Sequence, residues 1–437
     1  MPSAIAGHVR LIVIFNNLVI NKLVWLFVFL FPVLPHTLGA PTAQKVLHVF
    51  AFVFVALSLV IRRTYFKPGF VTAVVAICTV MMSYYMAVSL AFTNFLTFKD
   101  LPDYLRPLIY LIYILIPLIY PLDEEELRTF FVFFKKMFVF QVIISILIYI
   151  PALWPVVDIF KGRPSDDMPL HFYRWSGTYG YPSDFSFYLS FFIFYYFSFF
   201  ARRISMSVGE WSIVFVAFCA MFLSFSRGGL FSTVGILGLA FWLTGARTRK
   251  TSYLLLFAMV VASVSIFLSF SEEFEQVSYI LETFGGEDGD VDGSTSHRLK
   301  ELALAGEYLS QLPPLSEGSN RLELETRIEV IESFYGFHLI KWGILGLTAA
   351  LVIKFVFFLV CCYVYKKGLC SKRNETQTAL AFAVACLVAS EVLLFGFSSA
   401  ISDRFKTLPT FYLLFGYVLS GYLLTSNVSK KCRGGVV

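Results

Sequence analysis

The chain has 437 residues, of which 58% are hydrophobic and only 15% are charged, and its formal net charge is +6. Soluble domains are about 45–50% apolar and about 25% charged, so this composition excludes a soluble globular protein. The basic residues lie in short runs between apolar stretches. That pattern orients membrane proteins, so we expect no nucleic-acid partner.

Apolar runs long enough to cross a bilayer occur at about twelve places, which predicts an all-α, polytopic integral membrane protein. We expect residues 1–437 to form a single transmembrane domain, although polar residues interrupt the first run. The expected spans are 12–34, 44–61, 69–91, 104–121, 130–153, 183–201, 211–226, 229–245, 252–270, 338–364, 377–398 and 407–425.

The orientation of these spans follows from the lysines and arginines in the short loops. Every second loop is rich in them, and the loops in between are poor, so the rich side is expected to face the cytoplasm with both termini. The basic runs include Arg62/Arg63, Lys135/Lys136, Arg202/Arg203, Arg247/Arg249, Lys366/Lys367 and Lys430/Lys431.

Two segments on the opposite side are long, and loops of such length are commonly functional or disordered. The first covers 154–182, and the second, larger loop covers 271–332. The larger loop opens with an acidic stretch that lacks calcium-loop spacing, so we expect a solvated segment and no metal site. It continues as HRLKELALAGEYLSQL, whose apolar spacing predicts a short amphipathic helix.

Arginines gather on this outer side. They are Arg174 in the first loop, Arg227 at a tight turn between two spans, and Arg298, Arg321 and Arg327 in the second loop. An arginine at the membrane edge can bind a phosphate through two parallel hydrogen bonds. Gly228 and Gly229 permit close backbone approach at a helix start, where anions are favoured. The alternative is that these arginines are topological anchors or lipid-headgroup contacts.

Four segments in order over about 174–347 resemble one known family. They are RWSGTYGYPSDFSFYLS, FSFSRGGLF, HRLKELALAGEYLSQLPPLSEGSN and ESFYGFHLIKWGILGL, the last of which contains Gly343 and Gly346. Together with the topology, they resemble the O-antigen polymerase and O-antigen ligase superfamily. The resemblance implies a polytopic glycosyltransferase with its active site on the periplasmic face.

One departure from the family pattern separates its two activities. Ligases of the superfamily carry a His eleven residues before the first glycine of the last segment, and here that position is Glu332. His338 is close by but out of register, and we expect it to lie within a span. The absence of the ligase-type His favours a polymerase.

The resemblance also implies a reaction and its participants. A glycan leaves its undecaprenyl-pyrophosphate carrier and joins a second lipid-linked unit, without a metal or other cofactor, in the bacterial inner membrane. The expected partners are the lipid-linked donor and acceptor, membrane lipid and a chain-length regulator. The alternatives are an O-antigen ligase, which uses lipid A core as acceptor, and a flippase or other secondary transporter.

Particular residues are expected to carry this chemistry. Arginines would neutralise the pyrophosphate leaving group, and a carboxylate would take the proton of the acceptor hydroxyl. The expected catalytic residues are Arg227, Arg298 and Glu332, and the expected substrate-binding residues are Arg174, Gly228, Gly229, Arg327 and Tyr335. For Glu332 the alternative is a carboxylate that only stabilises a helix N-terminus.

One carboxylate is predicted inside a span. Glu391 lies in the eleventh expected span, where an ionisable group is costly unless it is partnered. It could pair with Lys354, hydrogen-bond between helices, or serve a proton-coupled transporter.

Overall fold

The computed structural model describes residues 22–26, 49–57, 69–93, 101–161, 173–179, 181–243, 261, 300–307, 331, 333–369, 374–397 and 407–433. Within these ranges the chain forms helices joined by turns, and no strand is present, which confirms the all-α prediction. The helices are α3 (Phe70–Thr93), α4 (Leu101–Ile119), α5 (Glu124–Ile146), η1 (Leu147–Tyr149), η2 (Pro151–Leu153), α6 (Trp154–Lys161), α8 (Pro182–Ala201), α9 (Val208–Leu223), α10 (Arg227–Leu243), α15 (Phe334–Leu369), α16 (Glu375–Leu393), η4 (Phe395–Phe397) and α17 (Leu408–Arg433).

Each of the longer helices lies on an expected span. Four stretches are long and apolar enough to cross a membrane, namely Glu124–Tyr149, Pro182–Ala201, Phe334–Leu369 and Glu375–Phe397. The total of about twelve spans remains a prediction. The expected spans 12–34 and 252–270 lie mostly outside the described residues, as does half of the span 44–61.

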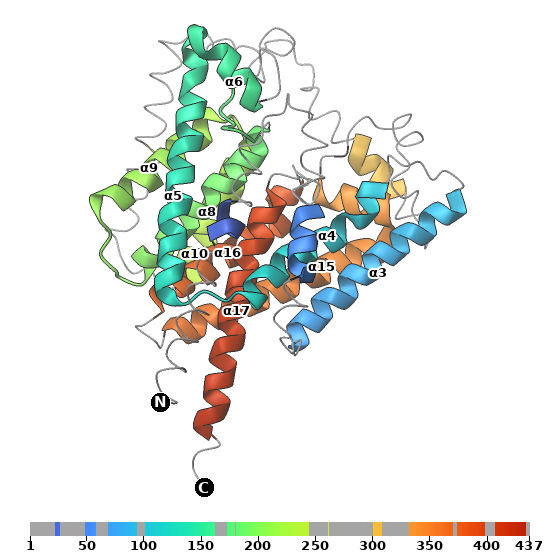
Figure 1. Ribbon diagram of the computed structural model, residues 1–437. Helices are drawn as coiled ribbons and strands as arrows, with labels where there is room; N and C mark the ends of the chain where they lie inside the picture. The colour runs from blue at the N-terminus through green and yellow to red at the C-terminus, as the bar shows by residue number, and fades with distance from the viewer. Residues whose placement is uncertain are drawn as a thin grey trace.

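The helices form two groups, which are joined by α15, α16 and α17 (Figure 1). Helices α5, α8, α9 and α10 make one group, and α3 and α4 make the other. Helix α16 packs on α8 in the first group and on α15, which in turn packs on α3. Helix α17 packs on α4, α15 and α16, so the last three long helices of the chain join the two groups.

Helix α8 is enclosed by its neighbours. It begins at Pro182, a position where the missing backbone N–H costs nothing. In its apolar, membrane-length stretch 83% is buried, compared with 44% in the corresponding stretches of α5 and α15. Its rings interlock with those of α5, because Phe131 stacks on Tyr195 with ring centroids 4.4 Å apart. Such pairs contribute about 0.5–1.5 kcal/mol beyond the burial of apolar area. They therefore help to hold α8 in place next to the site.

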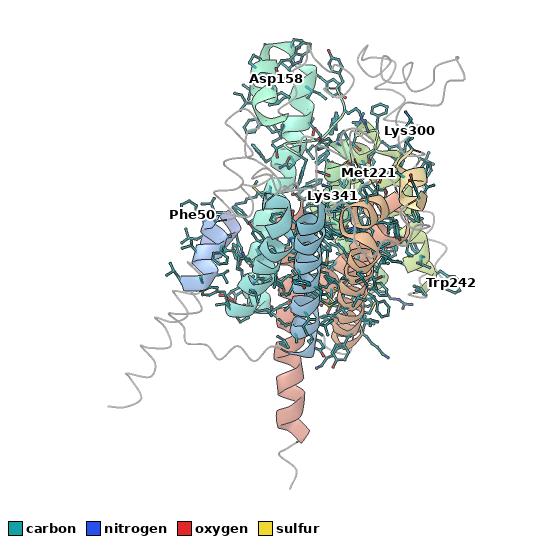
Figure 2. The ribbon with its side chains drawn as sticks, turned by 90° about the vertical axis from the view of Figure 1, so that its right-hand side faces the viewer. Phe50, Asp158, Met221, Trp242, Lys300 and Lys341 are labelled. Carbon is teal, nitrogen blue, oxygen red and sulfur yellow. The ribbon has the colours of Figure 1, made fainter. Side chains whose placement is uncertain are left out.

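Large apolar side chains cover the outside of the bundle. Phe231 and Trp242 on α10 are 72% and 61% exposed, and Phe355 on α15 is 61% exposed. Figure 2 shows Trp242 and Phe50 at the outer surface of the helical body. Patches of this kind are rare on soluble monomers and fit contact with lipid chains.

Gly343 and Gly346, which the sequence analysis singled out, have separate structural roles in α15. Gly343 breaks the helical geometry with φ 66° and ψ −174°, a conformation that disfavours any residue with a Cβ atom. A Cβ on Gly346 would collide with the side chain of Trp342. The first turns of α15 are thereby set at an angle to the rest of the helix.

Candidate functional site at the Arg227 end

The bundle has two ends that the contacts define. At one end, which we call the Glu375 end, Arg202 after α8 donates to the carbonyl oxygen of Glu375 at 3.2 Å. At the other end, the Arg227 end, helices α8, α10, α15 and α17 begin. Helices α8 and α10 run in the same direction, because Ser186 faces Gly229 and Ser190 faces Thr233 one turn further on.

The segment 173–179 binds the turn that precedes α10. Arg174 donates through Nε to the carbonyl of Ser224 at 3.1 Å and through Nη2 to that of Phe225 at 2.8 Å. The backbone N–H of Trp175 donates to Leu223. The two segments that sequence analysis singled out, RWSGTYG and SRGG, are therefore in direct contact.

The same segment is also bound to α5. Gln141, a buried amide within that apolar helix, accepts from the N–H of Thr178 at 2.7 Å and donates to its hydroxyl at 2.8 Å. Ser145 accepts from the N–H of Gly177, whose φ is 54°. A Cβ on Gly177 would collide with the Gln141 side chain. The loop is thus held from both sides.

The turn itself is tightly wound. Phe225 has φ 51°, a left-handed conformation that costs a residue with a Cβ about 1–2 kcal/mol. The bonds from Arg174 to this turn offset that cost. Ser186 on α8 donates to the hydroxyl of Ser226 at 3.0 Å, and a Cβ on Gly229 would collide with Ser186. Gly229 therefore brings α10 close to α8, and exposed Arg227 stands as the first residue of α10.

The predicted amphipathic helix of the large loop is helical over its described part, 300–307, and packs on α15. Its Glu301 is only 1% exposed and accepts from the backbone N–H of Ser333 at 2.9 Å and from its hydroxyl. Ser333 in turn accepts from the N–H of Gly336 at 2.9 Å. Ala305, one turn after Glu301, packs against Leu339 and Ile340. The loop helix is thus bound to the beginning of α15.

The beginning of α15 gathers further polar side chains. Tyr335 donates to the carbonyl of Val392 at the end of α16. His338 lies within the helix, as predicted, and its Nδ1 bonds the carbonyl of Phe334 at 2.8 Å. Lys354 and Glu391 form a buried ion pair at 2.5 Å between α15 and α16, which confirms the pairing considered from sequence.

The structure brings some of the expected site residues together. Arg174 contacts the turn that carries Arg227, and Gly228 and Gly229 follow in the first turn of α10. Tyr335 contacts the end of α16 instead. Arg298, Arg321, Arg327 and Glu332 lie outside the described residues.

Two polar residues at this end were missed by sequence analysis, namely Gln141 and Glu301. Each carries a signal of the same kind. Gln141 is a lone amide in an apolar span, where polar groups need a partner. Glu301 shares a face with Ala305 on an amphipathic helix, a place where a carboxylate is unusual.

The fold and this site define a helical integral membrane protein whose extramembrane segments are bound to helix ends at one end of the bundle. Residues 212–318 match a family model described as O-antigen ligase, a stretch that covers most of α9, all of α10 and the loop helix. The match covers about a quarter of the chain, and over this stretch the chain is similar to that family, in agreement with the resemblance found in the sequence. No curated protein matches it.

Proposed function

We propose that the protein polymerises lipid-linked oligosaccharide repeat units at the periplasmic face of the bacterial inner membrane, with both termini in the cytoplasm. A hydroxyl oxygen of the acceptor sugar attacks the anomeric carbon of the donor glycan. The bond from that carbon to the pyrophosphate oxygen breaks, and undecaprenyl pyrophosphate leaves with the electron pair. The hydroxyl proton passes to a base, for which Glu332 is our candidate.

The observation that carries this proposal is the assembly of the turn before Arg227. Arg174 donates to two carbonyls of the turn, and these hydrogen bonds fix the backbone of the turn. Fixed in this way, the turn leaves the Arg227 side chain exposed at the start of an apolar helix, which we propose is embedded in the membrane. A pyrophosphate tethered to a polyprenol lies at the same depth as such a helix start.

Electrostatic stabilisation is the main catalytic need of this reaction, because pyrophosphate is already a good leaving group. A fixed guanidinium can bind the pyrophosphate and the extra charge that develops as the sugar departs. Amides of the first turn of α10, at Gly228 and Gly229, favour an anion there. A metal is not required for either task.

The loop helix favours the participation of the remaining candidates. Glu301 binds Ser333 at the start of α15, so residues close in sequence to Arg298 and to Glu332 are in contact. Each candidate is within three residues of this contact along the chain. We propose that Arg298 acts with Arg227 on the pyrophosphate, and that Arg327 and Tyr335 contact the substrate.

A ligase is the second candidate, favoured by the description of the family model that residues 212–318 match. It runs the same chemistry with lipid A core as the acceptor. We prefer the polymerase because Glu332 occupies the position of the ligase-type His.

Deletion of the gene separates the candidates through the surface polysaccharide. Loss of a polymerase leaves core capped with a single repeat unit, whereas loss of a ligase leaves bare core. Loss of a flippase removes capped core, because the units stay on the cytoplasmic side. We expect the first pattern, and either of the others contradicts the proposal.

Complementation of that deletion tests Arg227. We expect Arg227→Ala to abolish long chains and Arg227→Lys to impair them, because loss of one preorganised donor costs about 10²–10³ in rate. The matched control is Arg202→Ala at the Glu375 end, which should make normal chains. Wild-type chain lengths from Arg227→Ala at normal protein level would remove Arg227 from the site.

A further inference from the structure

A carboxylate is buried where the loop helix, residues 300–307, meets the start of α15. Glu301 is 1% exposed, whereas its neighbours Lys300 and Leu302 are exposed. A carboxylate is costly to bury unless hydrogen bonds satisfy its oxygens. Here it accepts from the backbone N–H of Ser333 at 2.9 Å and from the Ser333 hydroxyl. The reaction proposed above leaves this side chain without a role.

The start of α15 is shaped to receive the carboxylate. Ser333 is the N-cap of the helix, because its side chain accepts from the backbone N–H of Gly336 at 2.9 Å. A Cβ on Gly336 would collide with Oε1 of Glu301, so the glycine makes the room that the carboxylate occupies. The N-terminus of a helix also carries a partial positive charge, which favours an anion there. We call Glu301, Ser333 and Gly336 the Glu301 socket.

Adhesion of the loop helix to α15 does not require this carboxylate. Ala305, one turn further along the same face, packs against Leu339 and Ile340 of α15. An apolar side chain at position 301 would extend that contact. A hydrogen-bonded polar group adds direction instead, because its bonds form only when the two helices meet in one register.

The other side of the same helical turn holds Tyr335. Its hydroxyl donates to the carbonyl of Val392 at the end of α16, and its ring lies against that of Phe397 with centroids 4.8 Å apart. The Tyr335 side chain is only partly buried. The first turn of α15 is therefore fixed by the loop helix on one side and by the end of α16 on the other, while Tyr335 stays accessible.

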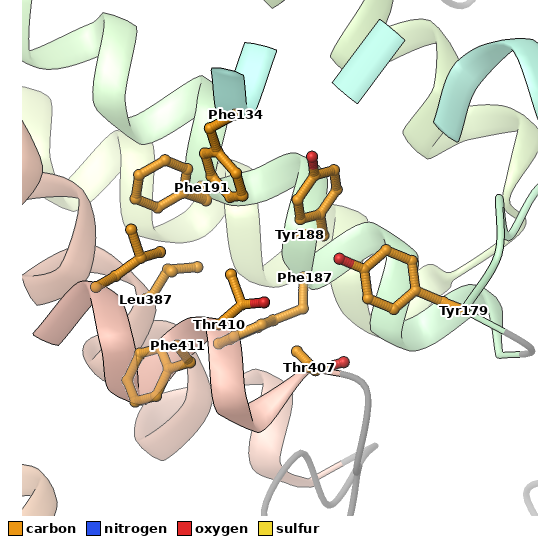
Figure 3. Close-up of a pocket in the computed structure, with 10 residues that line it drawn as sticks. Phe134, Tyr179, Phe187, Tyr188, Phe191, Leu387, Thr407, Thr410 and Phe411 are labelled. Atoms are coloured by element: carbon orange, nitrogen blue, oxygen red, sulfur yellow. The ribbon is translucent and has the colours of Figure 1, made fainter. Parts of the chain in front are cut away.

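The pocket between α8 and α17 is a weaker candidate for contact with the substrate (Figure 3). Rings and aliphatic side chains form most of its lining, and its cavity volume is about 20 Å³. That is room for about one water molecule, so no part of a glycan fits there. Contact with the substrate is better placed at partly exposed side chains such as Tyr335, which the Glu301 socket holds.

We propose that Glu301 is a positioning residue, which sets the register of the loop helix on α15 so that Arg298 and Tyr335 meet the same lipid-linked substrate. The inference rests on the function proposed above, which assigns both residues to the substrate. Arg298 precedes Glu301 by three residues, and Tyr335 follows Ser333 by two. A slip of the loop helix at the socket changes the alignment of these two residues, and a displacement of about 1 Å can cost about 10² in rate.

Substitutions at position 301 separate geometry from charge. Glu301→Gln keeps the length and an acceptor oxygen for Ser333, whereas Glu301→Asp keeps the charge but is one methylene too short. The measurement is kcat for glycan transfer by purified protein, on lipid-linked repeat units extracted from the deletion strain. We expect Glu301→Leu and Glu301→Asp to lose about ten- to hundredfold, and Glu301→Gln to keep most of the wild-type rate.

Thermal unfolding in detergent distinguishes positioning from a purely structural role. Glu301→Leu should unfold at the wild-type temperature, because the leucine extends the apolar contact that Ala305 makes. A fall in unfolding temperature that accounts for the lost rate would overturn the positioning role.

Gly336 tests the socket from the opposite side. Gly336→Ala leaves Glu301 unchanged but fills the room for its carboxylate, and alanine favours a helix over glycine. We expect the same loss of rate, and no further loss in Glu301→Leu/Gly336→Ala, because both changes break one contact. The matched control is Gly306→Ala on the loop helix, where a Cβ meets no atom within 4 Å. This control should transfer at the wild-type rate.

The outcomes separate the two proposals. A wild-type rate in Glu301→Leu overturns the positioning role, as does a Glu301→Gln variant as slow as Glu301→Leu, since charge and not geometry would then matter. If Glu301→Leu accumulates poorly, a wild-type rate in Gly336→Ala overturns it instead. If Arg227→Ala also transfers at the wild-type rate, the proposed function fails. If Arg227→Ala abolishes transfer and Glu301→Leu does not reduce it, only the positioning role fails.

Discussion

The two ends of the bundle satisfy their polar groups by different means. At the Glu375 end, helices begin with local caps, in which Asp123 and Glu126 bond each other's backbone at the start of α5. Ser207 and Glu210 do the same at α9. Long-range contacts are present there too, because Glu124 accepts from the backbone N–H of Thr376 and Arg202 donates to the carbonyl of Glu375.

At the Arg227 end the partners are far apart in sequence. Arg174 binds carbonyls about fifty residues later, Gln141 binds Thr178, and Glu301 binds Ser333. The difference teaches that local caps mainly start the helices at the Glu375 end, whereas contacts between distant segments hold the loops at the Arg227 end.

The strongest test of this comparison concerns the buried ion pair near the end of α16. Lys354→Met should destabilise the protein by about 3–5 kcal/mol, because it removes the cation from buried Glu391. The double variant Lys354→Met/Glu391→Leu should recover most of that loss. Unfolding in detergent measures both, and a double variant as unstable as the sum of the single ones would contradict the pairing.

An intermediate effect is expected where an arginine binds backbone carbonyls at each end. Arg174→Lys keeps the charge but loses the planar fork, and each hydrogen bond to a charged group contributes about 1.5–3 kcal/mol. We expect lower stability together with fewer long chains, because the turn before Arg227 shifts.

Arg202→Ala is the counterpart at the Glu375 end, where one bond to Glu375 is lost. We expect a smaller loss of stability and normal chains, measured as polysaccharide per amount of protein. Equal loss of product in the two variants would mean that the ends do not differ in function.

The smallest effect is expected from a local cap. Asp123→Ala removes the capping box of α5 and should cost about 1 kcal/mol of stability. Product length should stay the same, because this cap is at the Glu375 end. A change in chain length in the Asp123→Ala variant, at normal protein level, would contradict the functional difference between the two ends.

Sequence analysis predicted the features that depend on nearby residues. The apolar runs located the long helices, and SRGG located the turn before α10. Glycines at 343 and 346 were recognised, although their roles in a kink and a close contact became clear only from the structure. Pairing of Lys354 with Glu391 was one of three alternatives considered from sequence, because an unpaired charge in a span is costly, and the structure shows this pair.

The long-range contacts could not be predicted from sequence. Nothing near Arg174 shows that its partners are the carbonyls of Ser224 and Phe225. Backbone acceptors leave no trace in a sequence, since every residue offers the same carbonyl. Gln141 and Glu301 were missed for the same reason, because their partners are mainly backbone N–H groups and hydroxyls in distant segments.

The burial of α8 has a consequence for the order in which the protein is made. Its walls include α5, which precedes it and contacts it through stacked rings, and α9, α10 and α16, which follow it. Synthesis runs from the N-terminus, so α16 reaches the membrane after more than half of the chain has been inserted. Until then α8 lacks one wall, and its central position is completed only near the end of translation. Chains that stop before Glu375 should therefore be substrates for membrane quality control, however well their earlier helices insert.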